Sequence, residues 1–251
     1  MKVLAITQAR YGSSRLPAKI LKEVNGKTLL EIHLERILKS KLISKLKVAT
    51  TIEDGADIIV GIASKLKVES YKGSIDDVLQ RFYETAKPES PDYVVRLTSD
   101  CPLIDPAVID KVIKVCIETE SDYASNTLSP TYPDGVDVEV FRFSALEKAY
   151  NEVALKSDKE HVTPYIWRNS TFKGGKLFKS VNVENSVDYS RSRITVDTIE
   201  DFLLVKALIE NLGTEKSFIE YVGYLENHKK IKVLNNQHAR NEGYDKSLLN
   251  D

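Results

Sequence analysis

The first half of the chain alternates short apolar runs with longer stretches in which apolar residues recur at helical spacing. The apolar runs of strand length cover residues 2–7, 46–50 and 93–97, and the more polar segment 68–71 reads as a further short strand. Between the first two runs, Leu30, Leu34 and Ile37 keep the spacing of a helix face. Strands that alternate with helices of about 10–15 residues are typical of a parallel sheet covered on both faces. The pattern therefore predicts an α/β fold with a doubly wound, mostly parallel sheet.

The pattern is less regular after residue 121. Turn-forming residues fill 128–135. Further strands are predicted at 122–125, 136–141, 179–183 and 192–196, and helices at 143–154, 158–169 and after Thr198. We predict one domain over 1–226 and a polar C-terminal arm over 227–251, which lies over the domain or over a neighbouring subunit.

The loop after the first predicted strand carries much of the candidate chemistry. It spans residues 8–19 and contains Arg10, Gly12, Arg15 and Lys19. Right-handed crossovers place the loops that follow parallel strands on one edge of the sheet, where ligands bind. Backbone N–H groups, hydroxyls and cations in such a loop can hold a polyphosphate. A solvated surface loop has equal support, because Arg and Lys are usually exposed.

Two aspartates follow predicted strands. Asp100 comes after the strand at 93–97, either as a turn former or as a ligand to Mg²⁺, which takes one or two carboxylates together with substrate phosphates. Asp197 comes after the strand at 192–196 and can cap the next helix. Thr198 and Asp201, however, have the spacing of a capping box. If Thr198 is the cap, Asp197 is left free at the strand end.

Acidic and polar residues also gather in the second half. Asp137 and Glu139 share one face of the predicted strand at 136–141, either as a solvated edge or as a surface that meets a substrate. His161 and Tyr165 are i, i+4 neighbours on one face of the predicted helix at 158–169. A lone histidine is more often structural than a ligand, and the four histidines of the chain do not form a metal cluster.

The composition narrows the class of protein. A formal net charge of −1 argues against a general nucleic-acid or membrane-surface binder, so positive charge has to act locally. No apolar run approaches the roughly 20 residues of a membrane span, and the first residues are too short a hydrophobic run for a signal peptide. Cys101 and Cys116 have no metal-type spacing and do not indicate a disulfide framework, which fits a reducing cytoplasm.

The motifs together resemble a family. The loop Ala9-Arg10-x-Gly12-Ser13-x-Arg15-Leu16-Pro17-x-Lys19 is similar to the N-terminal signature of the CMP-sugar synthetases, which activate acylneuraminate, pseudaminate and 3-deoxy-manno-octulosonate with CTP. Other segments resemble one branch, the spore coat polysaccharide biosynthesis protein F type of cytidylyltransferase. They are Gly73-Ser74-x-Asp76-Asp77-Val78-Leu79, Arg96-Leu97-Thr98-x-Asp100-Cys101-Pro102-Leu103-Ile104-Asp105, Gly135-x-Asp137-Val138-Glu139, Glu160-His161-Val162-Thr163-Pro164-Tyr165, Arg193-x-Thr195-Val196-Asp197-Thr198 and Arg240-Asn241-Glu242-Gly243-Tyr244. The resemblance covers nearly the whole chain, in order.

The resemblance implies a nucleotide-diphospho-sugar transferase-like fold and a homodimer, with 126–138 as the candidate for a small projecting dimerisation element. It also implies CTP and Mg²⁺, with Asp100 and Asp197 as the metal ligands. The implied nucleotide site consists of Ala9, Arg10, Gly12, Ser13, Arg15, Lys19, Ser74 and Thr98. The candidates on the acceptor side are Asp134, Asp137, Glu139, His161, Tyr165 and Arg193.

The predicted reaction is attack of an acceptor oxygen on the α-phosphate of CTP, with pyrophosphate leaving, in the cytoplasmic synthesis of a surface polysaccharide or glycoconjugate. The predicted catalytic residues are Arg10, Lys19, Asp100 and Asp197. A glycosyltransferase that uses a nucleotide-sugar donor is the rival, since Asp137-x-Glu139 can imitate its metal motif. The cationic loop argues against the rival, because a diphosphate needs less positive charge than a triphosphate. A nucleotide sensor or scaffold is the third alternative.

Overall fold

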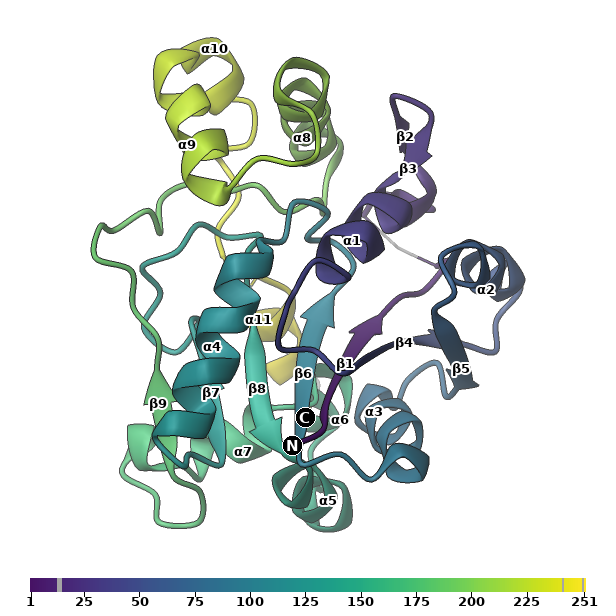
Figure 1. The fold of residues 1–251 in the computed structure, drawn as a ribbon, viewed down its shortest axis with the longest axis vertical. Helices are drawn as coiled ribbons and strands as arrows, with labels where there is room; N and C mark the ends of the chain where they lie inside the picture. Colours follow the sequence, from purple (N-terminus) through teal and green to yellow (C-terminus); the bar gives the residue numbers. More distant parts are fainter. Residues whose placement is uncertain (13–14, 241, 250) are drawn as a thin grey trace.

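The computed structural model describes residues 1–12, 15–240, 242–249 and 251, and a seven-stranded sheet of order β5-β4-β1-β6-β8-β7-β9 lies at its centre (Figure 1). All neighbouring strands are parallel except that β8 runs antiparallel to β6 and β7. The strands are β1 Val3–Gln8, β4 Lys45–Thr51, β5 Glu69–Gly73, β6 Tyr93–Thr98, β7 Tyr123–Ser125, β8 Glu139–Arg142 and β9 Ser180–Asn182, with a separate hairpin of β2 Glu23–Val24 and β3 Lys27–Thr28. This sheet confirms the predicted fold class.

Helices cover both faces of the sheet. The α-helices are α1 Leu29–Ile37, α2 Ala56–Lys65, α3 Val78–Ala86, α4 Pro106–Glu118, α5 Phe143–Glu152, α6 Lys156–His161, α7 Pro164–Arg168, α8 Ile199–Leu212, α9 Phe218–Asn227, α10 Lys229–Lys232 and α11 Glu242–Leu248. Short 3-10 turns occupy Lys19–Leu21, Lys87–Glu89 and Thr171–Lys173. In the part of the chain that the structure describes, no helix has the length and apolar character needed to cross a membrane.

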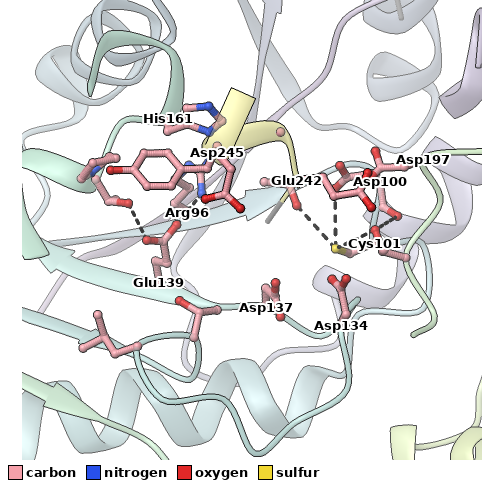
Figure 2. A pocket seen from close by; sticks show the side chains of 18 of the residues that line it. Arg96, Asp100, Cys101, Asp134, Asp137, Glu139, His161, Asp197, Glu242 and Asp245 are labelled. Atoms are coloured by element: carbon pink, nitrogen blue, oxygen red, sulfur yellow. Dashed lines mark hydrogen bonds and ion pairs between the residues drawn. The ribbon is translucent and has the colours of Figure 1, made fainter. Parts of the chain in front are cut away.

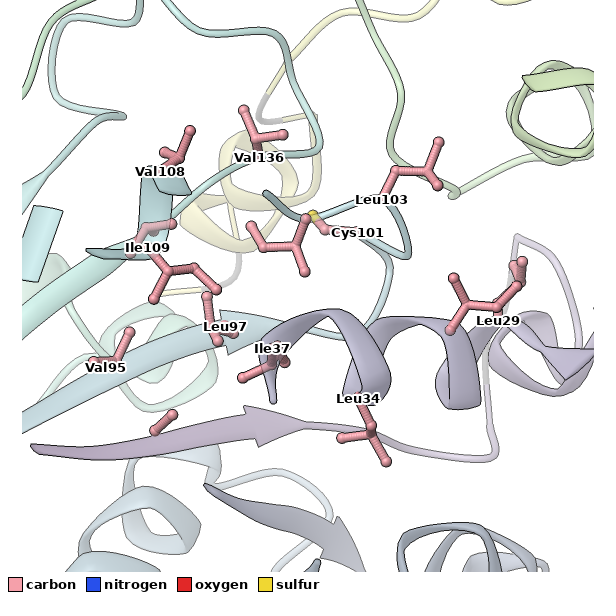
Figure 3. Packing of buried hydrophobic residues seen from close by; sticks show 14 of the residues in the cluster. Leu29, Leu34, Ile37, Val95, Leu97, Cys101, Leu103, Val108, Ile109 and Val136 are labelled. Atoms are coloured by element: carbon pink, nitrogen blue, oxygen red, sulfur yellow. The ribbon is translucent and has the colours of Figure 1, made fainter. Parts of the chain in front are cut away.

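The side chains of β1 divide between two hydrophobic clusters, one on each face of the sheet. Val3 and Ala5 pack with helices such as α1 and α4, whereas Leu4 and Ile6 pack with α3 and α5. Successive residues of a strand point to opposite faces, so a run without polar residues is what a strand covered on both sides requires. Figure 3 shows part of the first cluster, where Leu34 of α1 packs close to the strands.

Local caps fix two helix starts next to the sheet edge. Asp105 accepts a hydrogen bond from the Ala107 N–H at 2.9 Å and starts α4. Thr198 caps α8 in a capping box with Asp201, whose carboxylate accepts the Thr198 N–H at 3.1 Å. This confirms that Thr198 is the cap, and Asp197 is therefore available for another role.

The predicted helix at 158–169 is wrong, because the chain breaks it into α6 and α7. Val162 has a φ of 72°, and Pro164 begins the second helix. Proline lacks a backbone N–H and disfavours helical conformation in the residue before it. His161 and Tyr165 consequently lie on different helices and do not share a helix face.

Two segments between the sheet strands also differ from prediction. Residues 192–196 form no strand, and Arg193 makes only an isolated bridge with Asp134. The segment 126–138 packs into the domain instead of projecting, since Tyr132, Val136 and Val138 are at most 1% exposed and join the core. The homodimer stays a prediction.

The C-terminal arm lies on the domain. It contains α10 and α11, and α11 packs against α6. Figure 1 shows α11, in yellow, crossing behind β6 and β8. The carboxylate of Asp251 accepts a hydrogen bond from the Ser157 N–H at 2.7 Å. The arm thereby reaches the edge of the sheet where the candidate residues gather.

Candidate active site

Two adjoining cavities open beside the carboxyl ends of β1 and β6. The larger, of about 960 Å³, lies between the loop after β1, the start of α3 and α6, and is named here the loop cleft. The smaller, of about 520 Å³, is lined by segment 134–139 and the C-terminal arm, and is named the acidic cavity. Asp100 and Asp197 line both, so they stand at the junction.

Lys19 joins the two aspartates at this junction. Its ammonium lies 2.7 Å from Asp197 Oδ1 and 3.3 Å from Asp100 Oδ2. The backbone carbonyl of Asp100 accepts hydrogen bonds from the Val196 N–H at 2.7 Å and the Thr195 hydroxyl at 2.9 Å, which tie the two segments together. Burial opposes both charges, but the pairing outweighs it: the pKa of Lys19 is raised and the pKa of Asp100 is held well below its usual range.

Two arginines complete the charge network around Asp197. Arg15 lies 2.8 Å from Asp197 Oδ1, and Arg193 lies 3.2 Å from Asp197 Oδ2. Arg193 also contacts Asp134 at 2.5 Å and the fully buried Asp201 at 2.8 Å. Although burial opposes its charge, these carboxylates raise the pKa of Arg193. Arg193 therefore fixes the positions of Asp134 and Asp197 relative to α8.

Glu53, which follows β4, holds the loop after β1 in place. Its Oε1 atom accepts the backbone N–H groups of Tyr11 at 2.9 Å and Gly12 at 3.1 Å, and the Thr51 hydroxyl at 2.8 Å. A Cβ atom on Gly12 would lie 2.9 Å from Glu53 Oε2, so the carboxylate packs closely on this glycine. Burial opposes ionisation, yet the donated hydrogen bonds lower the pKa of Glu53. Sequence analysis missed Glu53, although its position after a parallel strand places it on the same sheet edge.

The wall of the acidic cavity carries carboxylates that are each paired with an arginine. Asp134 pairs with Arg193, Asp137 with Arg240 and Glu139 with Arg96. Figure 2 shows Asp134 and Asp137 on one side of the cavity, below Asp100 and Asp197, with His161 on the opposite side. Burial and the neighbouring carboxylates raise the pKa of Asp137 to about 7 against the pull of Arg240. The acidic face at Asp137 and Glu139 therefore meets a cavity and is not a solvated edge.

Comparison with known proteins decides the family. A family model described as cytidylyltransferase matches residues 4–239. The chain belongs to the cytidylyltransferase family. It is 38% identical to an uncharacterized protein of Methanocaldococcus jannaschii over 97% of this chain and 98% of that one. It is 30% identical to the spore coat polysaccharide biosynthesis protein SpsF of Bacillus subtilis over 84% of this chain and 88% of that one. The structure of a cytidylyltransferase from Leptospira borgpetersenii superposes with a TM-score of 0.86 at 36% identity, covering 92% of this chain and 97% of that one.

Most residues that the family resemblance assigns to the nucleotide line the loop cleft of this cytidylyltransferase. They are Ala9, Arg10, Gly12, Arg15, Lys19 and Thr98. Ser74 does not line the cleft, and its hydroxyl accepts a hydrogen bond from the Asp77 N–H at 3.1 Å at the start of α3. Ser13 lies outside the described residues.

Most acceptor-side candidates line the acidic cavity. They are Asp134, Asp137, Glu139, His161 and Arg193. Tyr165 is the exception and lines neither cavity. Its hydroxyl donates a hydrogen bond to Glu152, and its ring packs edge-on against Phe178. The break between α6 and α7 turns Tyr165 away from the side on which His161 stands.

Sequence analysis did not assign the C-terminal arm to the site. Arg240 pairs with Asp137 and donates to the Tyr132 carbonyl at 3.1 Å. Tyr244 contacts His161 edge-on at a centroid distance of 5.2 Å and lines the acidic cavity. The motif around Arg240 and Tyr244 was visible in the sequence, but nothing local indicated which distant residues it contacts.

The aspartate pair suits a magnesium ion. One ammonium bridges both carboxylates, so the position of a single cation can serve Asp100 and Asp197 together. Among the described residues, no group of three or more His, Cys, Asp or Glu side chains could hold a metal ion. The remaining ligands would have to be phosphates and water, which is the usual arrangement for Mg²⁺.

Proposed function

We propose that this cytidylyltransferase transfers CMP from CTP to a sugar, sugar acid or related small acceptor and releases pyrophosphate. The observation that carries the proposal is the meeting of a cation-rich cleft and a carboxylate-rich cavity at Asp100 and Asp197. Two compartments suit the two substrates, and in this proposal the α-phosphate lies at the shared aspartates. The name of SpsF supports a role in the synthesis of a surface polysaccharide or glycoconjugate.

In the proposed reaction, an acceptor oxygen attacks the α-phosphorus from the acidic cavity. A P–O bond forms to the acceptor, and the bond to the bridging oxygen of pyrophosphate breaks on the opposite side, because attacking and leaving oxygens lie roughly in line. Lys19 and Arg15 exchange carboxylate oxygens for phosphate oxygens when CTP binds, and Arg10 adds charge at the cleft. Loss of one such contact raises the barrier by about 3–4 kcal/mol.

We assign Asp100 and Asp197 as the residues that hold Mg²⁺. When bound, the ion supplies positive charge to the α-phosphate oxygens and helps to orient them. Arg193 contacts Asp197 through one oxygen and keeps that carboxylate turned toward the junction.

A hydroxyl acceptor loses its proton when it attacks, so the reaction needs a base, and Asp137 is our candidate. It lines the acidic cavity, and burial together with neighbouring carboxylates raises its pKa to about 7. A base is most effective when its pKa lies near the working pH. An acceptor that attacks through an ionised phosphate oxygen needs no such step.

The lining of the acidic cavity supports a hydroxyl-rich or amino-bearing acceptor more than a strongly anionic one. Seven of its lining residues are carboxylates, against four arginines and lysines, so acidic side chains outnumber basic ones in the lining. Trp167, Phe172 and Tyr244 add aromatic faces, against which the apolar face of a sugar ring can pack.

The test is to incubate the protein with CTP, Mg²⁺ and a panel of neutral sugars, amino sugars, sugar acids and sugar phosphates. Pyrophosphate and a CMP conjugate, identified by mass spectrometry, should appear in equal amounts. The variants D100A and D197A should fold and form neither product. Sugar transfer from a nucleotide-sugar donor without pyrophosphate would instead identify the glycosyltransferase. Unchanged biological function of D100A and D197A would point to a sensor or scaffold.

A further inference from the structure

Arg81 is a buried cation in the wall of the loop cleft. It lies on α3, is only 2% exposed and lines the cleft. Its Nε and Nη1 atoms are buried and have no hydrogen-bond partner among the described residues. A buried charge is costly unless it is paired and hydrogen-bonded. These two nitrogens therefore lack the hydrogen bonds that Arg193 makes to its carboxylates.

The surroundings of Arg81 hold the side chain at the cleft. A Cβ atom on Gly73 would lie 2.8 Å from Arg81 Cγ, so the arginine stem passes over a position that only glycine leaves open. Burial and the nearby charge of Arg10 lower the pKa of Arg81 to about 10, against the attraction of Glu53 and Asp77. Two cations thus stand near each other on the side of the cleft that borders β5 and α3.

The sheet order, together with in-line attack, indicates which part of a nucleotide would reach this side. The acidic cavity lies next to β8, the aspartate junction follows β6, and β1, β4 and β5 come next in order. An acceptor that attacks from the acidic cavity pushes the leaving group in line toward β1 and beyond. The leaving group therefore moves toward the side on which Arg10 and Arg81 stand.

We propose that Arg81 binds the β- and γ-phosphates of the nucleotide and stabilises the departing pyrophosphate. This inference rests on the proposed function. A phosphate group neutralises Arg81 and Arg10 at once, whereas a neutral pyrimidine would leave two like charges side by side. Arginine is suited to this contact because its planar fork of donors matches phosphate oxygens.

The experiment compares the nucleotide affinities of the unaltered protein, R81Q and the control R191Q by titration calorimetry with CTP, CDP and CMP. Arg191 is exposed and lies outside the lining of both cavities, so R191Q makes the same charge change at a distance. R81Q should weaken CTP binding by about 10- to 100-fold, the scale of a hydrogen bond to a charged group. CMP binding should change by about twofold or less, and R191Q should match the unaltered protein.

Inorganic pyrophosphate gives a second readout. It should compete with CTP for the unaltered protein and for R191Q, and compete poorly for R81Q. The melting temperature without nucleotide should stay equal or rise in R81Q, because the variant removes an uncompensated charge. A structural arginine would instead lower the melting temperature and leave the ratio of CTP to CMP affinity unchanged.

Each result decides between the alternatives. Equal weakening of CTP and CMP would place Arg81 at the nucleoside and overturn the assignment, and so would an unchanged CTP affinity. Tight, Arg81-dependent CTP binding without pyrophosphate formation from any acceptor would contradict the proposed function and leave the assignment intact. If the unaltered protein binds no CTP, both proposals fail.

Discussion

The two sides of the sheet edge are built differently. The loop cleft lies beside the parallel strands β1, β6 and β5, and most of its lining comes from loops and helix starts that directly follow those strands, with α6 and the C-terminal arm completing it. The acidic cavity lies beside the antiparallel strand β8, and its lining comes from segment 134–139, α6, α7 and the C-terminal arm. The loop cleft is formed mainly by the repeated strand–loop–helix units of the sheet. The acidic cavity is formed by contacts between segments that are distant in the sequence.

The charges of the two sides differ in the same way. In the loop cleft, the Nε and Nη1 atoms of Arg81 have no hydrogen-bond partner among the described residues, and Lys19 and Arg15 pair with Asp197, which lies at the junction. In the acidic cavity, each carboxylate of the wall has its own arginine. A buried guanidinium with unsatisfied donors suits an anionic ligand, whereas carboxylates that are already paired with arginines suit an uncharged or weakly charged one. We infer that nucleotide binding and acceptor selection are separate properties of the two sides.

The largest expected effect comes from D197N, which removes a carboxylate from the junction that both sides share. Removal of this carboxylate should lower turnover by roughly 10³-fold, because the proposed metal site and the anchor of Arg15 are lost together. Pyrophosphate release measures the effect, and circular dichroism should show an unchanged fold. The control is D57N, at an aspartate whose side chain is 89% exposed and pairs with Lys72. Retention of more than a tenth of the activity would contradict the role of the junction.

The next effect is on stability and concerns mainly the acidic side. R193Q should lower the free energy of unfolding by about 3 kcal/mol, because Asp201 is fully buried and loses its ion pair. Denaturant unfolding measures the change, with R191Q as the matched control. CTP affinity, measured at a temperature where R193Q is folded, should fall far less than it does in R81Q. A loss below about 1 kcal/mol would mean that Asn235 and the backbone donors alone satisfy Asp201.

The loop cleft was predictable from sequence because its geometry follows from local rules. An apolar run that fits a strand buried on both faces, a polar loop after it and a Thr198–Asp201 capping box are all readable within a few residues. The rule that parallel strands end on one edge then brings Asp100 close to Lys19. Arg81 was not predicted as a site residue, because helical spacing identifies the buried face of a helix but not whether a buried side chain has hydrogen-bond partners.

The acidic cavity was predictable only as a list of residues. Arg240 and Asp137 are 103 positions apart, and no local pattern links such a pair. Tyr165 was misplaced because the helix was continued through Pro164, although proline disfavours helix in the preceding residue. That signal was available in the sequence. The contact of the arm with the site was not, since only the tertiary structure brings α11 to α6.

The pH dependence of the activity tests the role of Asp137 on the acidic side. The activity of the unaltered protein with a hydroxyl acceptor should rise with pH up to about 7 and then level off, since only the ionised carboxylate accepts a proton. D137N should lose about 10²-fold at the plateau and lack this rise. CTP affinity should stay unchanged, which separates the two sides.

Stability gives an independent check on the same group. The pKa of Asp137 is raised on folding, so the folded protein holds a proton that the unfolded chain releases between about pH 4 and 7. This contribution to the free energy of unfolding is therefore full at low pH and declines as pH rises through that interval. D137N should lose this decline. An identical slope in both proteins would contradict the raised pKa.

The smallest expected effect concerns the C-terminal arm and tests whether acceptor selection extends to it. Tyr244 lines the acidic cavity and contacts the rings of His161 and Trp167 edge-on, but it lines no part of the loop cleft. Y244A should raise the acceptor KM about fivefold, the scale of one aromatic contact, and leave the KM for CTP unchanged. The matched control is Y224A, because Tyr224 stacks on His228 and lines neither cavity. If Y244A instead raises the KM for CTP as much as that for the acceptor, the arm serves both sides, and the division between them lies at Asp100 and Asp197 alone.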